Sequence, residues 1–246
     1  MSSEPTRWIL GTPAGSPDGD RLFCFPHAGS GASAFTAWRA HLPEAVELYP
    51  VQLPGRENRS GEPMPDTLDE LAARLADDLL PLLRPPYLLF GHSFGGLVCY
   101  ALTTELHRRG HPLPRQLLIS GARPPHLAAK DAYHTLAHDE LLSHVRDTGG
   151  ISAPLLEHPA FVRRLLDVVR NDLRMAAEFS PAPAAVLPCP VTVFAAADDP
   201  VVSPVEMEDW RDYAGGEFVM HRGPGDHYAV YDPSGAFFST IVRSQR

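Results

Sequence analysis

The chain has 246 residues, of which 44% are apolar and 21% are charged, and its formal net charge is −9. These proportions are typical of a globular protein with one sizeable core. The negative charge argues against sequence-independent binding to nucleic acid or to an acidic membrane surface. The start of the chain lacks the features of a signal peptide, and no apolar run approaches the roughly 18 residues of a membrane helix, so we expect a cytoplasmic protein.

The metal-binding and disulfide-forming residue types show no organised spacing. Cys24, Cys99 and Cys189 lie far apart without a C-x-x-C pair, which argues against a disulfide framework and a zinc site. His134 and His138 are four residues apart, but no H-E-x-x-H motif is present. We therefore expect neither a metal nor a cofactor.

Strands and helices alternate along most of the chain. After a Pro-, Gly- and Asp-rich stretch at 1–20, which predicts a loose arm, the expected elements follow in order. They are a strand at 21–25, a helix at 35–41, a strand at 46–52, a helix at 67–83, a strand at 87–90, a helix at 96–109, strands at 117–120, 191–195 and 217–221, and a helix at 235–246. This alternation predicts an α/β fold with a mostly parallel central sheet flanked by helices, in a single domain over 1–246.

One block, residues 123–184, interrupts the alternation because it contains no convincing strand. Helices are predicted at 139–146 and 161–178, and the second has an apolar stripe at positions 162, 165, 166, 169, 173 and 176. A helical insert between two late strands predicts a lid, with this stripe facing the site. The alternative is a pair of ordinary crossover helices.

The strongest chemical signal is the G-x-S-x-G sequence at 91–95. It follows the predicted strand at 87–90 and opens the predicted helix, which is the setting of a nucleophile elbow. Gly91 and Gly95 leave room where a Cβ would clash with the sharp turn. Ser93 is therefore the predicted nucleophile, and the alternative is a glycine-rich crossover loop.

A serine hydroxyl needs a base, and in α/β-hydrolases the acid and then the histidine follow the serine in the chain. His227 lies in a loop ahead of the last helix and is preferred to His221, which is expected at a strand end. Asp199 follows the strand at 191–195 and precedes a proline, which favours an extended backbone. Asp198 and Asp226 remain alternatives for the acid, with turn hydrogen bonds as their structural role.

An oxyanion hole requires two backbone N–H groups directed at the developing negative charge. The predicted donors are Phe94, directly after the nucleophile, and Ala28, in the loop that follows the first strand. His27 in the same loop is interpreted as a residue that shapes the loop.

In these motifs the sequence resembles the type II thioesterases that accompany polyketide synthases and nonribosomal peptide synthetases. Seven segments occur in the family's order and together span nearly the whole chain: 25–30, 52–56, 91–96, 120–123, 170–174, 197–200 and 225–227. Ala196 and Ser30 depart from the family, which usually has glycine at these positions.

The resemblance implies a free-standing editing enzyme of the α/β-hydrolase superfamily, and we expect it to be a monomer. It would hydrolyse aberrant acyl groups from the phosphopantetheine thiol of an acyl or peptidyl carrier protein, through an acyl intermediate on Ser93. Two alternatives remain: a carboxylesterase or lipase-like hydrolase of small esters, and a protein that binds carrier-linked acyl chains without cleaving them. The presence of Ser93, Asp199 and His227 argues against the second alternative.

The sequence predicts a carrier-docking surface on the helix expected at 161–178. Arg163, Arg170 and Arg174 are spaced at i, i+7 and i+11 and therefore share one face of that helix. They predict a basic patch for an acidic carrier protein, and the alternative is a solvated helix face.

Overall fold

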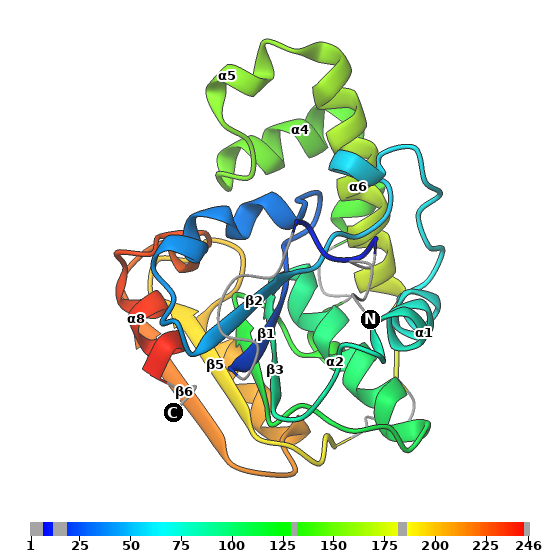
Figure 1. Ribbon diagram of the computed structural model, residues 1–246. Coiled ribbons are helices and arrows are strands. Elements are labelled where there is room, and N and C mark those ends of the chain that lie inside the picture. Colours follow the sequence, from blue (N-terminus) through cyan, green and yellow to red (C-terminus); the bar gives the residue numbers. More distant parts are fainter. Residues whose placement is uncertain (1–6, 12–18, 129–131, 182–185, 244–246) are drawn as a thin grey trace.

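The computed structural model describes residues 7–11, 19–128, 132–181 and 186–243. A six-stranded sheet forms its centre, with the strand order β2-β1-β3-β4-β5-β6 (Figure 1). The strands are β1 (Asp20–Phe25), β2 (Val46–Pro50), β3 (Tyr87–His92), β4 (Gln116–Ser120), β5 (Val191–Ala196) and β6 (Phe218–Gly223). Every pairing between these neighbours is parallel, which confirms the predicted α/β fold.

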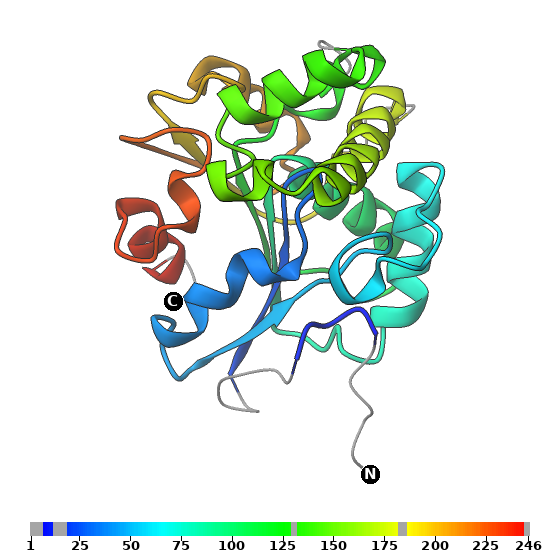
Figure 2. The same cartoon turned by 90° about the horizontal axis from the view of Figure 1, so that it is seen from above.

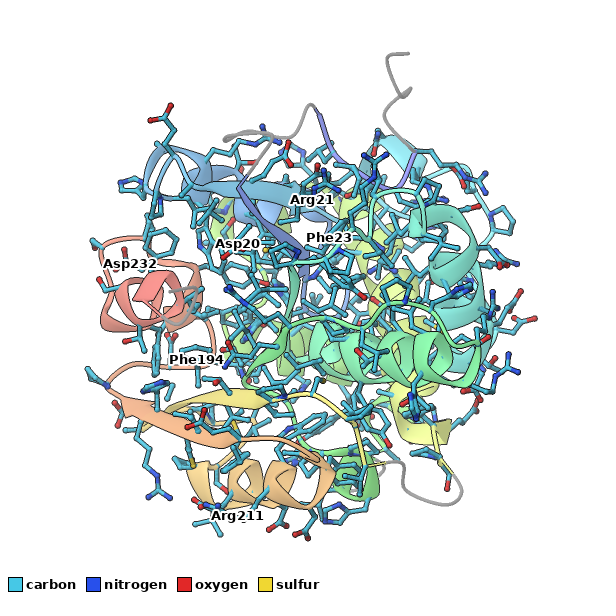
Figure 3. The ribbon with its side chains drawn as sticks, turned by 60° about the horizontal axis from the view of Figure 1, so that its bottom comes forward. Asp20, Arg21, Phe23, Phe194, Arg211 and Asp232 are labelled. Atoms are coloured by element: carbon cyan, nitrogen blue, oxygen red, sulfur yellow. The ribbon has the colours of Figure 1, made fainter. Side chains whose placement is uncertain are left out.

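The two faces of the sheet are covered by different helices, and side chains alternate between them along each strand. Phe23 of β1 belongs to the core beneath α1 (Leu68–Leu79) and α2 (Phe94–Arg108), whereas Leu22 belongs to the opposite core. That second core lies beneath the 3-10 helix η1 (Ala32–Ala40) and α8 (Ala236–Arg243). Figure 3 shows Phe194 of β5 between the sheet and α8, where its ring meets Phe237 edge-on at 6.3 Å.

Burial on both faces explains the composition of the central strands. All six residues of β3 are buried, and Phe90 lies opposite Cys24 of β1 and Leu118 of β4. A strand covered on both faces requires a nearly continuous apolar sequence instead of alternation. The apolar run at 87–90 therefore lies in the middle of the sheet, directly before the proposed nucleophile.

The predicted helix at 67–83 is confirmed as α1, but it ends earlier. The Thr67 hydroxyl oxygen accepts a hydrogen bond from the Glu70 N–H at 3.1 Å and caps the first turn. The helix ends at Leu79 because Pro81 has no N–H for a further helical hydrogen bond. The predicted helix at 35–41 is instead a 3-10 helix, in which the buried Phe35 and Trp38 fall on one side, three residues apart.

The predicted loose arm is wrong for residues 8 and 9. Trp8 and Ile9 are buried, and Ile9 forms an antiparallel bridge with Val51 beside β2. The guanidinium of Arg59 lies 4.2 Å from the ring centroid of Trp8. The large apolar surface of Trp8 explains its burial, whereas the surrounding Pro, Gly and Asp residues suggest only loop. Asp20, the last residue of the predicted arm, already begins β1, and residues 1–6 and 12–18 of that prediction lie outside the described residues.

Between β4 and β5 the described part of the chain forms a series of helical elements, followed by an isolated bridge of Leu187 with Ala214. The helical elements are α3 (Pro125–Ala128), η3 (Tyr133–Thr135), α4 (His138–Asp147), α5 (Ala153–Leu156) and α6 (Pro159–Glu178). The elements α4, α5 and the first half of α6 lie above the carboxyl ends of the strands (Figure 1), and the view from above shows them crossing the sheet (Figure 2). They share a small apolar core of their own: Leu141, Val145, Ile151, Val162, Leu166 and Val169.

Two further helical elements, α7 (Pro204–Glu208) and η4 (Asp209–Tyr213), connect β5 to β6 and were not predicted from the sequence. Both are short, and so they contain too few apolar repeats to show helical spacing. None of the helices in the described ranges has the length and apolar character needed to cross a bilayer.

Candidate active site

Ser93 occupies the turn between the last residue of β3 and the first residue of α2. Its backbone has φ 54° and ψ −120°, a left-handed conformation that is strained for any residue with a side chain. Its N–H donates to the carbonyl oxygen of Ser120 at 2.8 Å, which fixes the turn to β4. A Cβ at Gly95 would overlap the carbonyl oxygen of Phe25, and one at Gly91 would overlap that of Gly95. These contacts explain both glycines of the motif.

The structure brings His227 and Asp199 together across 28 residues of sequence. His227 Nδ1 lies 2.7 Å from Asp199 Oδ2, and the two side chains are 4% and 1% exposed. The other carboxylate oxygen accepts the N–H groups of Val201 and Val202 at 2.7 and 3.0 Å. Because both oxygens have partners, the carboxylate is held in one orientation toward the imidazole.

The alternative candidates lie elsewhere and have structural roles. Asp198 is exposed, and Asp226 is exposed with its Oδ1 accepting the N–H of Tyr228 at 2.9 Å, a turn hydrogen bond. His221 lies on β6 and stacks on the ring of Phe194 at 5.5 Å. The structure therefore pairs His227 with Asp199.

Three of the catalytic and oxyanion-hole residues proposed from the sequence line one small cavity of about 60 Å³. Ser93, His227 and Ala28 all line it, although they come from the turn after β3, the loop after β6 and the loop after β1. Phe94, the other proposed oxyanion donor, is the first residue of α2. The helical insert and neighbouring segments supply the other walls: His27, His144, Val145, Thr148, Gly150, Val169, Leu173, Val201 and Tyr228.

A larger cavity of about 490 Å³ adjoins the first, and both are lined by His27, Ala28 and Gly150. It lies between the loops at 27–33 and 55–60 and the helices α5 and α6. Leu165 of the predicted stripe lines this larger cavity, whereas Val169 and Leu173 line the smaller one. The stripe therefore faces both cavities as well as the core of the insert.

The sequence motifs did not reveal the role of Gly121, at the end of β4. It has φ +54°, and a Cβ there would lie 2.9 Å from Cε1 of His92 and 3.1 Å from Cε1 of His227. The position therefore needs glycine for its backbone conformation and for the space that the His227 ring occupies. The one indication of this role in the sequence was that Gly121 belongs to the segment 120–123, which resembles the thioesterases.

Two further histidines surround His227 and are neutral at pH 7. Burial and the neighbouring His227 lower the pKa of His27 to about 3, and the same causes hold the pKa of His92 well below its ordinary value. His27 Nδ1 lies 2.8 Å from the Tyr231 hydroxyl, which agrees with the role of a loop-shaping residue. Because both rings are uncharged, they place no positive charge beside His227 that would oppose its protonation.

No group of three metal-binding side chains is arranged around a common point in the described part of the chain. Cys24, Cys99 and Cys189 are free and buried, and burial raises the pKa of all three thiols. A thiol that stays protonated is a poor nucleophile and a poor metal ligand, so their role is packing.

The predicted basic patch on α6 stays a prediction, and two of its three arginines have partners within the chain. Arg170 donates through Nη1 to the carbonyl oxygen of Leu136 at 2.8 Å, and so it holds the insert together. Arg174 forms an ion pair with Glu178 at 2.8 Å. Arg163 is exposed. The positions of the arginines on one helix face did not reveal these partners, because the partners lie in another segment or on the next helical turn.

A parallel sheet with a strained serine between strand and helix, beside a buried His–Asp pair, defines an α/β-hydrolase. The chain belongs to the thioesterase family, because the family model described as "Thioesterase domain" matches residues 20–244. The gramicidin S biosynthesis protein GrsT of Aneurinibacillus migulanus is 31% identical over 231 residues, which cover 94% of this chain and 90% of that protein.

Two solved structures place the chain within the family. RedJ, a thioesterase from the prodiginine pathway of Streptomyces coelicolor, is 38% identical with a TM-score of 0.84, over 99% of this chain and 94% of that one. The type II thioesterase BorB from the borrelidin biosynthetic cluster is 28% identical with a TM-score of 0.86, over 100% of both chains. These similarities confirm the predicted likeness to type II thioesterases of polyketide and nonribosomal peptide clusters.

Proposed function

We propose that this protein is an editing thioesterase that hydrolyses aberrant or stalled acyl groups from the phosphopantetheine thiol of carrier proteins. The observation that carries the proposal is the common cavity of Ser93, His227 and Ala28, with His227 held by Asp199 at 2.7 Å. The named roles of GrsT and RedJ in gramicidin S and prodiginine biosynthesis support this class of substrate.

In the proposed mechanism His227 accepts the proton of the Ser93 hydroxyl as its oxygen attacks the thioester carbonyl. Asp199 holds the Nδ1–H side of the imidazole and stabilises the imidazolium that forms. The N–H groups of Ala28 and Phe94 stabilise the negative oxygen of the tetrahedral intermediate. The C–S bond then breaks, and His227 gives its proton to the departing thiolate.

Water completes the cycle by hydrolysing the acyl ester on Ser93. His227 removes a proton from the attacking water, a second tetrahedral intermediate forms in the same oxyanion hole, and the free acid leaves as Ser93 regains its proton. A thioester has little resonance stabilisation and a good leaving group, so moderate binding of the acyl group is sufficient for turnover.

The helical insert at 123–184 acts in this proposal as a lid on a single α/β-hydrolase domain. Val169 and Leu173 of α6 form an apolar wall of the cavity with Ser93. An apolar pocket discriminates one methylene by only about 1–3 kcal/mol, so short unbranched acyl groups should be cleaved over a broad range. The enzyme would work as a cytoplasmic monomer, without a cofactor, on acyl or peptidyl carrier proteins.

A direct comparison of substrates tests this function. We expect faster hydrolysis of acyl-phosphopantetheine on a carrier protein than of a p-nitrophenyl ester with the same acyl group, together with labelling of Ser93 by a fluorophosphonate. A preference for the free ester would indicate a carboxylesterase. Binding of the acylated carrier protein without labelling or turnover would indicate a non-catalytic binding protein.

A further inference from the structure

Two of the segments shared with the thioesterases, 52–56 and 170–174, have no role in the proposed mechanism. A buried ion pair joins them. Arg56 follows β2, and Asp172 lies in the second half of α6. Their side chains are 4% and 0% exposed. Nη1 of Arg56 lies 2.7 Å from Oδ2 of Asp172, and Nη2 lies 2.8 Å from Oδ1, so the contact is bidentate.

The same pair holds the loop that contains Ala28. Asp172 Oδ2 accepts the N–H of Gly29 at 2.8 Å, and Arg56 Nη1 donates to the carbonyl oxygen of Ser30 at 3.2 Å. Gly29 has φ +81°, and a Cβ there would overlap the side chain of Val169 on α6. The loop is therefore pressed against α6 and fixed through one donor and one acceptor of its backbone.

Stability alone does not account for this pair. Asp172 shares the helix face of Leu165 and Val169, where the other inward positions are apolar. A buried ion pair is often no more stabilising than well-packed apolar residues of the same volume. What apolar residues cannot supply here is an acceptor for the Gly29 N–H, which would otherwise lack this partner.

We propose that Asp172 and Arg56 are positioning residues of the oxyanion hole, an inference that rests on the proposed function. The Gly29 N–H belongs to the same peptide plane as the Ala28 carbonyl, so the bond to Asp172 sets the rotation about the Cα–C bond of Ala28. The contact of Arg56 with Ser30 fixes the next part of the loop. Together they direct the Ala28 N–H toward the cavity that contains Ser93, and they make α6 of the insert a structural part of the oxyanion hole.

The decisive variant replaces both charges, as Arg56→Met with Asp172→Leu. Removing both partners leaves no unpaired buried charge, so the melting temperature should stay close to that of the wild type. The Gly29 N–H has no acceptor in this variant. Loss of one oxyanion donor costs about 10²–10³ in kcat, and since the donor is displaced instead of removed, we expect the lower end, about 10²-fold, with KM changed less than about threefold.

A second readout does not depend on thioester turnover. A fluorophosphonate that reacts with Ser93 develops negative charge on its phosphoryl oxygen in the same hole, so its second-order labelling rate should fall by a similar factor. Arg56→Lys keeps Asp172 charged and bound to Gly29 but loses the bidentate contact, and it should lose about 10-fold in both readouts. Arg59→Met is the matched control, since it removes a buried arginine that pairs with Glu62, and it should lower stability but not the labelling rate.

The outcomes separate this inference from the proposed function. If the double variant is as stable and as active as the wild type in both readouts, the pair has only a structural role and the inference is wrong. Should the double variant not fold, a labelling rate of Arg56→Lys equal to that of the wild type leads to the same conclusion. A wild type that is labelled at Ser93 but does not hydrolyse acyl thioesters contradicts the proposed function, while the labelling rates still decide the role of Asp172.

Discussion

Nδ1 of His227 lies 2.7 Å from Oδ2 of Asp199, and the second carboxylate oxygen accepts two backbone N–H groups. Asp199 therefore holds the Nδ1 side of the ring, and His227 lines the cavity that also contains Ser93. The hydrogen bond fixes the imidazole tautomer, because the nitrogen that faces the carboxylate carries the proton. This arrangement makes the roles of individual side chains testable.

Ser93→Ala should abolish thioester hydrolysis while the protein remains folded. The strained backbone at this position is set by the surrounding turn, and alanine removes only the hydroxyl. Without the nucleophile only the residual catalysis of the site remains, of the order of 10³–10⁴ over water. Steady-state kinetics with an acyl-N-acetylcysteamine thioester, together with circular dichroism, measures this. A folded variant with nearly wild-type activity would contradict the assignment of the nucleophile.

Asp199→Asn should lower kcat by about 10⁴-fold, because an amide in this position favours the wrong imidazole tautomer. Asp198→Asn is the matched control, since that side chain is exposed and adjacent in sequence. Its kcat should stay within about threefold of the wild type. Kinetics on the same thioester distinguishes the two variants, and reversed effects would assign the acid to Asp198.

Gly121→Ala should reduce kcat by at least about 10-fold, because the new Cβ would lie 3.1 Å from Cε1 of His227 and displace the ring. Gly110→Ala is the control, since Gly110 also has positive φ, at +70°, but no heavy atom near its Cβ position. Both variants carry backbone strain of about 1–2 kcal/mol. Thermal melts should therefore show a loss of stability for both variants, larger for Gly121→Ala because its Cβ also crowds His92 and His227. Only Gly121→Ala should lose activity.

The free energy of unfolding should fall as the pH decreases below about 6.5. The folded-state pKa of His27 is about 3, so between pH 6.5 and 3 the unfolded chain binds a proton at this residue that the folded chain does not. His92, whose pKa is also strongly lowered, adds to the effect. Within this window His27 contributes about 1.4 kcal/mol per pH unit.

Urea unfolding at several pH values measures this dependence. His27→Asn removes one titrating group while its amide can still bond to the Tyr231 hydroxyl. Its unfolding free energy should depend less steeply on pH than that of the wild type between pH 6.5 and 5. Equal slopes for the two proteins would show that His27 does not titrate differently in the folded and unfolded states.

The sequence determined the secondary elements wherever periodicity or an apolar run was long enough. Residues 87–90 predicted a buried strand and residues 191–195 a further strand, and both are parallel strands of the sheet. The short helix at 204–208 and the buried Trp8 were missed, because neither belongs to a periodic pattern. Ser93 could be proposed as the nucleophile because its elbow is a local motif, in which strand, turn and helix are contiguous.

Only the tertiary structure decided which distant residues meet. From the sequence alone, Asp199, Asp198 and Asp226 were all candidates for the catalytic acid. In the folded chain Asp199 binds His227, which lies 28 residues later. The spacing of Arg170 suggested a docking surface, but its guanidinium bonds to a carbonyl of another segment of the insert. Asp172 carried no catalytic signal in the sequence, yet it binds Gly29, 143 residues earlier. Local motifs specify backbone geometry, whereas a side chain's partner depends on how the strands, loops and insert are packed around the sheet.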